Sequence, residues 1–329
     1  MKDMNKHNLS TSNFNAKKDV LTVIIKFLII WVIILGFFFC VVSPEYAKGY
    51  TASLIDKVNR LESVNEPKII LIGNSNVAFG IRSEMIEAAF EMPVINMGLH
   101  GGLDNALHEE MAKFNVNRGD VIIICHSEFN DDDTLSESAA ALAWITIENH
   151  WELWKMIRIK DIPAMLKSFP TYMKKANTLY LNGEGNKTAD SPYERSSFNE
   201  YGDNIYSVTH EQTFAFAEGD ITVPEISAEF INRINDLNEF AEQKGATLLI
   251  AGYPIGEGIY TPDKKEYDAF EEELRSQVDC DVISHYRDYF IDYKYFYNTS
   301  LHLNYEGAGI RTEQLIHDLK TYFEETNKK

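Results

Sequence analysis

The sequence predicts an α/β fold, a three-layer sandwich with a mainly parallel central sheet, preceded by one transmembrane helix. Short and wholly apolar runs, such as 68–73, are typical of central parallel strands that are covered on both faces. These runs alternate with segments of helical periodicity, which is the order of βαβ units. A long apolar run at 20–42 predicts the membrane helix.

The N-terminal run 20–42 is interrupted only by Lys26 and is long enough to cross the hydrocarbon core of a bilayer, which is about 30 Å thick. Residues 1–19 are polar and rich in lysine, which favours a cytoplasmic N-terminus. We therefore expect an uncleaved signal anchor that places the rest of the chain outside the cell. The alternative is a cleaved secretory signal, for which the region around Ala47 is a poor cleavage site.

The remaining chain is expected to form a helical juxtamembrane linker at 43–66 and one domain at 67–329. Strands are predicted at 68–73, 93–98, 119–129, 246–255 and 280–290, and helices at 82–90, 103–114, 227–245, 264–278 and 304–329. The alternation is lost between 131 and 222, where a tryptophan-rich helix at 138–157 precedes a long polar segment. We interpret 131–222 as an insertion that covers or shapes a site.

Composition limits the classes of function. The formal net charge of −19 argues against nucleic-acid binding, which needs clustered lysine and arginine. Cys40, Cys125 and Cys280 are too few for a disulfide framework; a bridge between the last two stays open, but buried free thiols are expected. No cysteine or histidine spacing suits zinc. The acids Glu128 and 131–133 favour a solvated run over a metal site, so we expect neither metal nor cofactor.

Polar corners follow the predicted strands. The first strand ends at Gly73-Asn74-Ser75-Asn76, the second at 96–102, and the third at His126-Ser127-Glu128-Phe129-Asn130, while His302 precedes the last helix. Ligands of open parallel sheets bind at the carboxyl ends of the strands, so these corners are expected to form one site. A serine hydroxyl is a poor nucleophile until a base takes its proton, and His302 is the candidate base for Ser75. Ser75 as a plain turn residue is the competing interpretation.

Over about 68–130 and 245–323 the chain resembles the SGNH (GDSL-like) hydrolase superfamily. The first family block, Gly-Asp-Ser, is Gly73-Asn74-Ser75 here, and the second, Asn-x-Gly-x-x-Gly, is 96–101. The third, Gly-x-Asn-Asp, is degraded to 126–131. The final block, an acid shortly before a histidine, is 298–302, with Asn298 at the acid position. The segment after His302 is most similar to membrane-anchored members found beside membrane-bound O-acyltransferases, including D-alanine-transfer proteins.

This resemblance implies a flavodoxin-like three-layer fold and a set of roles. Ser75 would be the nucleophile and His302 its base, oriented by Asn298, or by Asp288 or Asp292 in its place. The backbone N–H groups of Ser75 and Gly101 would bind the oxyanion. The third donor of the family is an asparagine, for which Asn130 is the nearby candidate, although Glu128 is closer to that position by register.

The resemblance implies an extracytoplasmic O-acyl transferase or esterase that forms an acyl-Ser75 intermediate, with a small acyl group such as acetyl. Its acceptor would be a cell-envelope polysaccharide or polymer, and its partner an integral-membrane O-acyltransferase. The asparagine at the acid position and the degraded third block favour an alternative, a non-catalytic glycan-binding or scaffold protein with the same fold. A further alternative is a membrane-tethered accessory that binds its partner through the anchor helix.

Overall fold

The computed structural model describes residues 16–41, 45–130, 132–148, 150–185 and 187–326. It divides into two compact units, 1–44 and 45–329. The first contains α1 (Ala16–Val41), whose stretch Lys18–Phe37 is apolar and long enough to cross a membrane, with no part of it buried. The predicted tail at 1–19 lies largely outside the described residues.

The second unit is an α/β structure whose central sheet has five strands, all parallel, in the order β2-β1-β3-β4-β6. These strands are β1 (Ile69–Ile72), β2 (Val94–Asn96), β3 (Val121–Ile124), β4 (Thr247–Ile250) and β6 (Asp281–Val282). All five lie within the predicted strand segments. A second, two-stranded parallel sheet pairs β5 (Ile255–Glu257) with β7 (Phe290–Asp292), and the sequence analysis did not separate it.

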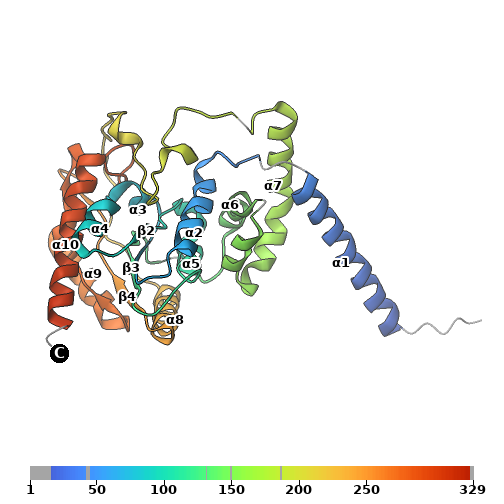
Figure 1. Cartoon of the computed structure of the whole chain (residues 1–329), viewed down its shortest axis with the longest axis horizontal. Coiled ribbons are helices and arrows are strands. Elements are labelled where there is room, and N and C mark those ends of the chain that lie inside the picture. Colours follow the sequence, from blue (N-terminus) through green and yellow to red (C-terminus); the bar gives the residue numbers. More distant parts are fainter. Residues whose placement is uncertain (1–15, 42–44, 131, 149, 186, 327–329) are drawn as a thin grey trace, which may run out of the picture. The chain divides into compact units, whose positions relative to one another are not determined.

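Helices cover both faces of the five-stranded sheet (Figure 1). Side chains alternate along each strand, so Ile69, Leu71 and Ile123 point to one face. There they form a dry core with Leu315 and Leu319. That face is covered by α3 (Ser75–Gly80), α4 (Ser83–Phe90) and α10 (Tyr305–Thr326), and the other by α2 (Ser53–Ser63), α5 (Asp104–Met111) and α8 (Ala228–Lys244). The remaining long helix of this part is α9 (Lys264–Gln277).

The segment predicted as a linker begins with a helical turn and α2, which packs against β2. Leu54, Val58 and Leu61, which share one helical face, are fully buried. Lys57 on the same helix is also buried, and its ammonium group donates to the carbonyl oxygen of Asn96 at 2.8 Å. Residues 45–66 therefore belong to the same compact unit as the sheet.

The insertion differs from the sequence expectation in two ways. The single tryptophan-rich helix expected at 138–157 ends early, as α6 (Glu137–Ile147), because Glu148 leaves the helical conformation. Its buried carboxylate accepts from the Tyr46 N–H at 3.1 Å and from the Tyr172 hydroxyl at 2.8 Å. Part of the expected polar segment is α7 (Ile162–Asn182), a helix that contains Pro170 on its exposed side and packs on α6.

The rest of the insertion returns to the sheet. Asp203 is buried there and accepts from the Ser83 hydroxyl at 2.5 Å and from the Asn96 side-chain amide at 2.8 Å. The Asn204 N–H donates to the carbonyl oxygen of Ala78 at 2.7 Å. These bonds attach the insertion to α3 and to the end of β2, next to the candidate site.

Candidate functional site

The candidate site lies at the carboxyl ends of β1, β2 and β3. β2 and β3 flank β1 on opposite sides. The chain goes from β1 to β2 on one side and then crosses to β3 on the other, so the strand order reverses here. Open parallel sheets bind ligands at such a switch point. Ser75 is the third residue after β1 and the first residue of α3. The corner needs Gly73, since a Cβ atom there would lie 2.6 Å from the Val77 side chain and 2.9 Å from the Cys125 carbonyl oxygen.

Asn74 organises the corner around Ser75. Its side-chain oxygen caps α3 by accepting from the Asn76 N–H at 2.9 Å, as asparagine does at helix N-termini. Its side-chain nitrogen donates to the Ser127 hydroxyl at 2.8 Å, on the loop after β3. Asn74 therefore connects the first and third corners. The sequence analysis noted Asn74 only as a replacement for aspartate and did not assign it this role.

Ser75 is half-buried, and within the described chain no hydrogen bond uses its hydroxyl group or its N–H. Phe79 lies four residues further along α3, so the two side chains share one face of the helix, one turn apart. The ring of His302 stacks on Phe79, with centroids 4.0 Å apart and planes inclined by 3°. The fold thus brings His302, which is 227 positions from Ser75 in the sequence, into contact with the helix that Ser75 begins.

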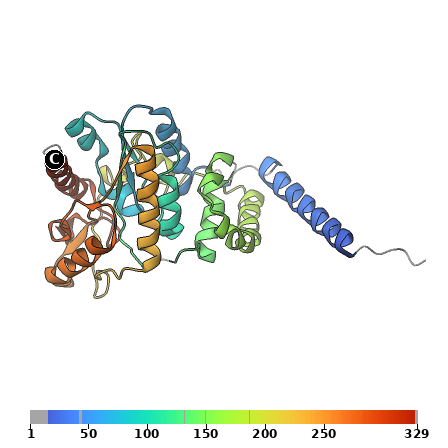
Figure 2. The same ribbon diagram turned by 90° about the horizontal axis from the view of Figure 1, so that it is seen from below.

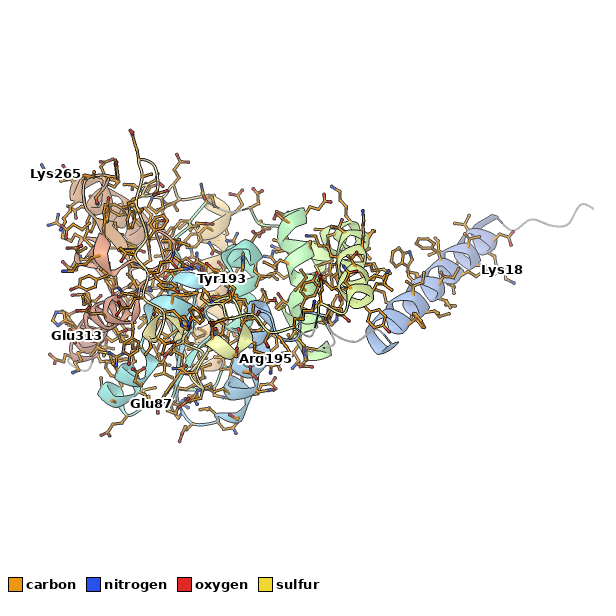
Figure 3. All side chains as sticks on the ribbon, turned by 90° about the horizontal axis from the view of Figure 1, so that it is seen from above. Lys18, Glu87, Tyr193, Arg195, Lys265 and Glu313 are labelled. Carbon is orange, nitrogen blue, oxygen red and sulfur yellow. The ribbon has the colours of Figure 1, made fainter. Side chains whose placement is uncertain are left out.

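His302 is 5% exposed, and its Nδ1 lies 2.7 Å from the side-chain oxygen of Asn298. An amide oxygen is only an acceptor, so Nδ1 carries the proton and Nε2 keeps a free lone pair. The Asn298 side-chain nitrogen donates to the Tyr193 hydroxyl at 3.0 Å, which orients the amide (Tyr193 is labelled in Figure 3). Within the described chain, neither Asp288 nor Asp292 bonds to His302. Asn298 is therefore the residue that orients the imidazole.

Burial lowers the pKa of His302 to about 3, and the neighbouring His100 lowers it further in the same direction. No carboxylate accepts from Nδ1, so nothing nearby compensates for the loss of hydration. The imidazole is therefore neutral at physiological pH, in the protonation state that a general base needs. Its low pKa also makes it a weaker base than a histidine beside an aspartate.

Gly101 begins a 3₁₀ turn after β2 and lies beside Asn74, because a Cβ atom on Gly101 would be 3.5 Å from the Asn74 Cβ. In the described residues the Gly101 N–H, like that of Ser75, donates to no protein acceptor. The turn is held by His100, whose Nδ1 accepts from the Gly102 N–H at 2.9 Å. These two N–H groups, which follow the carboxyl ends of β1 and β2, are available as the donors that an oxyanion requires.

The two remaining sequence candidates lie on the loop after β3. Glu128 and Asn130 both have exposed side chains. Glu128 lines a small cleft of about 190 Å³ together with Ser127, Ser300 and Leu301. No hydrogen bond in the described residues links Glu128 or Asn130 to Ser75 or His302. Ser75 and Gly101 thus both lie next to Asn74, and His302 with Asn298 packs against α3. Neither Glu128 nor Asn130 is identified as the third donor.

Aromatic residues that the sequence analysis did not select enclose His302. Tyr50 is buried and lies 6.3 Å from Phe79 and 6.2 Å from His100, measured between ring centroids. Tyr193, from the insertion, lies 6.4 Å from His302. Tyr50 precedes the sheet and Tyr193 follows three of its strands, so only the fold relates them, and no local pattern could have identified them.

The described residues hold no group of three or more histidine, cysteine, aspartate or glutamate side chains that could bind a metal ion. Cys125 and Cys280 are free thiols. A scan against protein-family models, a search of curated proteins and a search of solved structures give no match to this chain.

Proposed function

We propose that this protein is a serine-dependent O-acyl transferase or esterase of the SGNH type, in which Ser75 is the nucleophile and His302 the general base. The observation that supports it most is the placement of His302. Its ring is stacked on Phe79, one turn from Ser75, and Asn298 holds the proton on Nδ1. This leaves Nε2 as the acceptor on a buried imidazole that packs against α3, the helix that begins with Ser75.

The chemistry takes two steps. The Ser75 oxygen attacks an ester carbonyl, its proton passes to Nε2 of His302, and the N–H groups of Ser75 and Gly101 stabilise the oxyanion. The leaving alcohol takes the proton from His302 as the tetrahedral intermediate collapses to an acyl-Ser75 ester. An acceptor hydroxyl or water then gives its proton to His302 and attacks this ester, and the proton returns to Ser75.

The proposed acceptor is a cell-envelope polysaccharide or polymer, and the proposed partner is an integral-membrane O-acyltransferase. Both follow from the resemblance to membrane-anchored members of this superfamily. The apolar helix α1 supports the membrane location, and the basic residues before it favour a cytoplasmic N-terminus with the second unit outside the cell.

The asparagine at the acid position supports a second candidate, a non-catalytic protein that binds glycans at the same edge. An amide orients an imidazole but cannot stabilise the imidazolium by charge. The low pKa of His302 also argues against efficient proton transfer, because a base with a pKa of about 3 has little tendency to take the Ser75 proton.

A fluorophosphonate probe, which reacts with activated serines, separates these candidates. The full chain, purified in detergent, is expected to be labelled, with labelling lost in Ser75→Ala and weakened in His302→Ala. Ser276→Ala, which removes an exposed hydroxyl on α9, is the matched control and should label as the unchanged chain does. Release of acetate from an acetyl ester should follow the same order. Glycan binding without any labelling would instead identify the non-catalytic protein.

A further inference from the structure

Helices α6 and α7 pack against each other and lie beside the part of the molecule that contains the sheet (Figure 2). A cleft of about 580 Å³ lies between these helices and the loop that contains Gly101. Ala141, Leu142 and Ile145 give α6 an apolar stretch along the cleft, and the polar residues Glu137 and Ser138 line it at the start of the same helix. His100, Gly102 and Asp104 form its end at the loop. A volume of this size is typical of sites for small organic ligands.

A second, more open groove of about 790 Å³ adjoins the first. Tyr46, Pro170 and Leu179 are among its lining residues, and the groove shares Thr171 and Lys175 with the first cleft. The two spaces therefore meet at these two side chains of α7. We call the two clefts together the track; Tyr46 lines one end of it and Gly102 the other.

 The track thus runs along α7 from the start of the second unit to the candidate oxyanion loop.

Two adjacent lysines of α7 line the track, Lys174 in the open groove and Lys175 where the two clefts meet. Lys174 and Lys175 are exposed, and within the described chain neither forms an ion pair, whereas Lys160 and Lys167 are paired with Asp133 at 2.5 Å and Glu137 at 2.6 Å. What distinguishes Lys174 and Lys175 from other exposed lysines is that they line a groove whose lining, in the part of the chain that the structure describes, includes no acidic side chain. They favour an anionic group at the junction of the two clefts.

The outer end of the track is lined by Tyr46, near the start of the second unit. Tyr46 is fixed beside α7, because Glu148 accepts from both its N–H and the Tyr172 hydroxyl. In the sequence, three residues separate Glu45 from Val41, the last residue of α1. A membrane-spanning α1 would tether the second unit to a bilayer, which makes membrane lipids available as ligands.

We propose that the track binds an anionic amphiphile drawn from the membrane, with its apolar chain along Ala141, Leu142 and Ile145 and its anionic group at Lys174 and Lys175. The apolar stretch of α6 suits a hydrocarbon chain and the free lysines suit a phosphate group. Gly102 at the inner end adjoins the candidate oxyanion donor. That this ligand is a substrate rests on the proposed function, whereas its binding does not.

Native mass spectrometry of the full chain in detergent tests the binding. The probes are palmitoyl lysophosphatidylglycerol, the zwitterionic lysophosphatidylcholine with the same chain, and glycerol phosphate without a chain. We expect the first to bind at least about tenfold more tightly than the second, because each lysine favours an anionic lipid, and glycerol phosphate not to bind. Equal affinity for the two lipids would overturn the proposal.

Variants locate the site. The pair Lys174→Glu and Lys175→Glu should weaken binding of the anionic lipid by at least about tenfold, and Leu142→Trp, which fills the apolar cleft, should weaken both lipids. Lys265→Glu with Lys320→Glu, two exposed lysines on α9 and α10, is the charge-matched control and should bind normally. Because the charge reversals are exposed, they test the track even if Leu142→Trp fails to fold. Unchanged binding in the Lys174 and Lys175 pair would exclude the track.

The outcome is separate from that of the proposed function. Ser75→Ala should bind the lipid normally, and the charge-reversed chain should still react with the fluorophosphonate probe. Lipid binding without serine labelling would contradict only the proposed function, and labelling without lipid binding only the track.

Discussion

His302 is oriented by an amide instead of a carboxylate, and this determines what the site can do. The Asn298 oxygen at 2.7 Å selects the tautomer, and stacking on Phe79 fixes the plane of the ring. Neither contact supplies the negative charge that stabilises an imidazolium during proton transfer. His302, the proposed base, is thus held in one orientation, and burial lowers its pKa to about 3.

Asn298→Asp should increase esterase activity. A carboxylate in this position would accept from Nδ1 and raise the pKa of His302 toward neutrality, closer to the value at which a general base is most effective. Tyr193 could keep its contact by donating to the new carboxylate, because a phenol is both donor and acceptor. We expect an increase of at least about tenfold in kcat, within the usual range for acid–base groups, measured with an acetyl ester as a function of pH.

The control for this prediction is Asn182→Asp, which introduces the same charge at an exposed position at the end of α7. It should leave both the rate and its pH dependence unchanged. An unchanged rate in Asn298→Asp would show that the orientation of His302 does not limit catalysis, and would favour the non-catalytic candidate.

At the scale of elements, the strands were the most predictable part of the structure. β1 and β3 are apolar throughout because both of their faces are buried, and that pattern is visible in the sequence. α7 was not predicted, because Pro170 and the polar residues around it resemble a loop. It is a helix because one of its faces, with Met165, Phe169 and Tyr172, is buried. The rings of Phe169 and Tyr172 pack against Trp144 of α6. Such long-range packing overrides local preference.

The same distinction applies to the candidate site. Ser75, Gly101 and His302 could be selected because each lies in a motif at the end of a strand or before a helix. Tyr50, Phe79 and Tyr193 surround His302 only through tertiary packing, so the local sequence does not identify them.

Arg311 connects three elements and should be essential for stability. It is buried on α10 and donates to the carbonyl oxygens of Asn76 in α3 at 2.7 Å and of Gly252 after β4 at 3.1 Å. Arg311→Met removes both donors and leaves two buried carbonyls without these partners. We expect the free energy of unfolding to fall by about 2–5 kcal/mol, measured by urea denaturation, because each buried carbonyl left without a partner costs about 1–3 kcal/mol.

Arg287→Met provides the comparison, since Arg287 is exposed and pairs only at the surface with Asp268. It should cost at most about 1 kcal/mol. Similar losses in the two variants would mean that Arg311 does not hold α10 against α3. Fluorophosphonate labelling of Arg311→Met should also decrease, because α3 begins with Ser75.

At the scale of the whole molecule, two buried histidines make stability depend on pH. Burial lowers the pKa of His108 to about 3, and the neighbouring His126 lowers it in the same direction. Burial also lowers the pKa of His302 to about 3. In the unfolded chain both titrate near 6.5. Between about pH 3 and pH 6.5 the unfolded chain therefore binds more protons than the folded protein. The contribution of the two neutral histidines to stability is complete above about pH 6.5 and is lost as the pH falls toward 3.

The expected result is that the free energy of unfolding decreases as pH falls below 6.5, by up to about 1.4 kcal/mol per pH unit for each of the two histidines. His108→Leu should reduce this slope by the contribution of one histidine, up to about 1.4 kcal/mol per pH unit. Neither ring nitrogen of His108 has a hydrogen-bond partner in the described structure, so leucine removes no such bond. Urea denaturation between pH 5 and pH 7.5 provides the measurement, and an unchanged slope would contradict the burial of a neutral His108.

The state of the N-terminus decides how the whole molecule is held at the membrane. An uncleaved anchor retains α1, so intact mass spectrometry of the protein extracted from membranes should find the full 329-residue chain. The protein should also resist alkaline carbonate extraction. Replacing Ile29 and Ile33 by lysine places two further charges in the apolar stretch and costs about 2.5–3.5 kcal/mol each at the centre of a bilayer. This variant should become extractable, whereas Ile29→Leu with Ile33→Leu should not. A mature chain that begins near Ala47 would identify α1 as a cleaved signal, and would leave the second unit without a tether to the membrane.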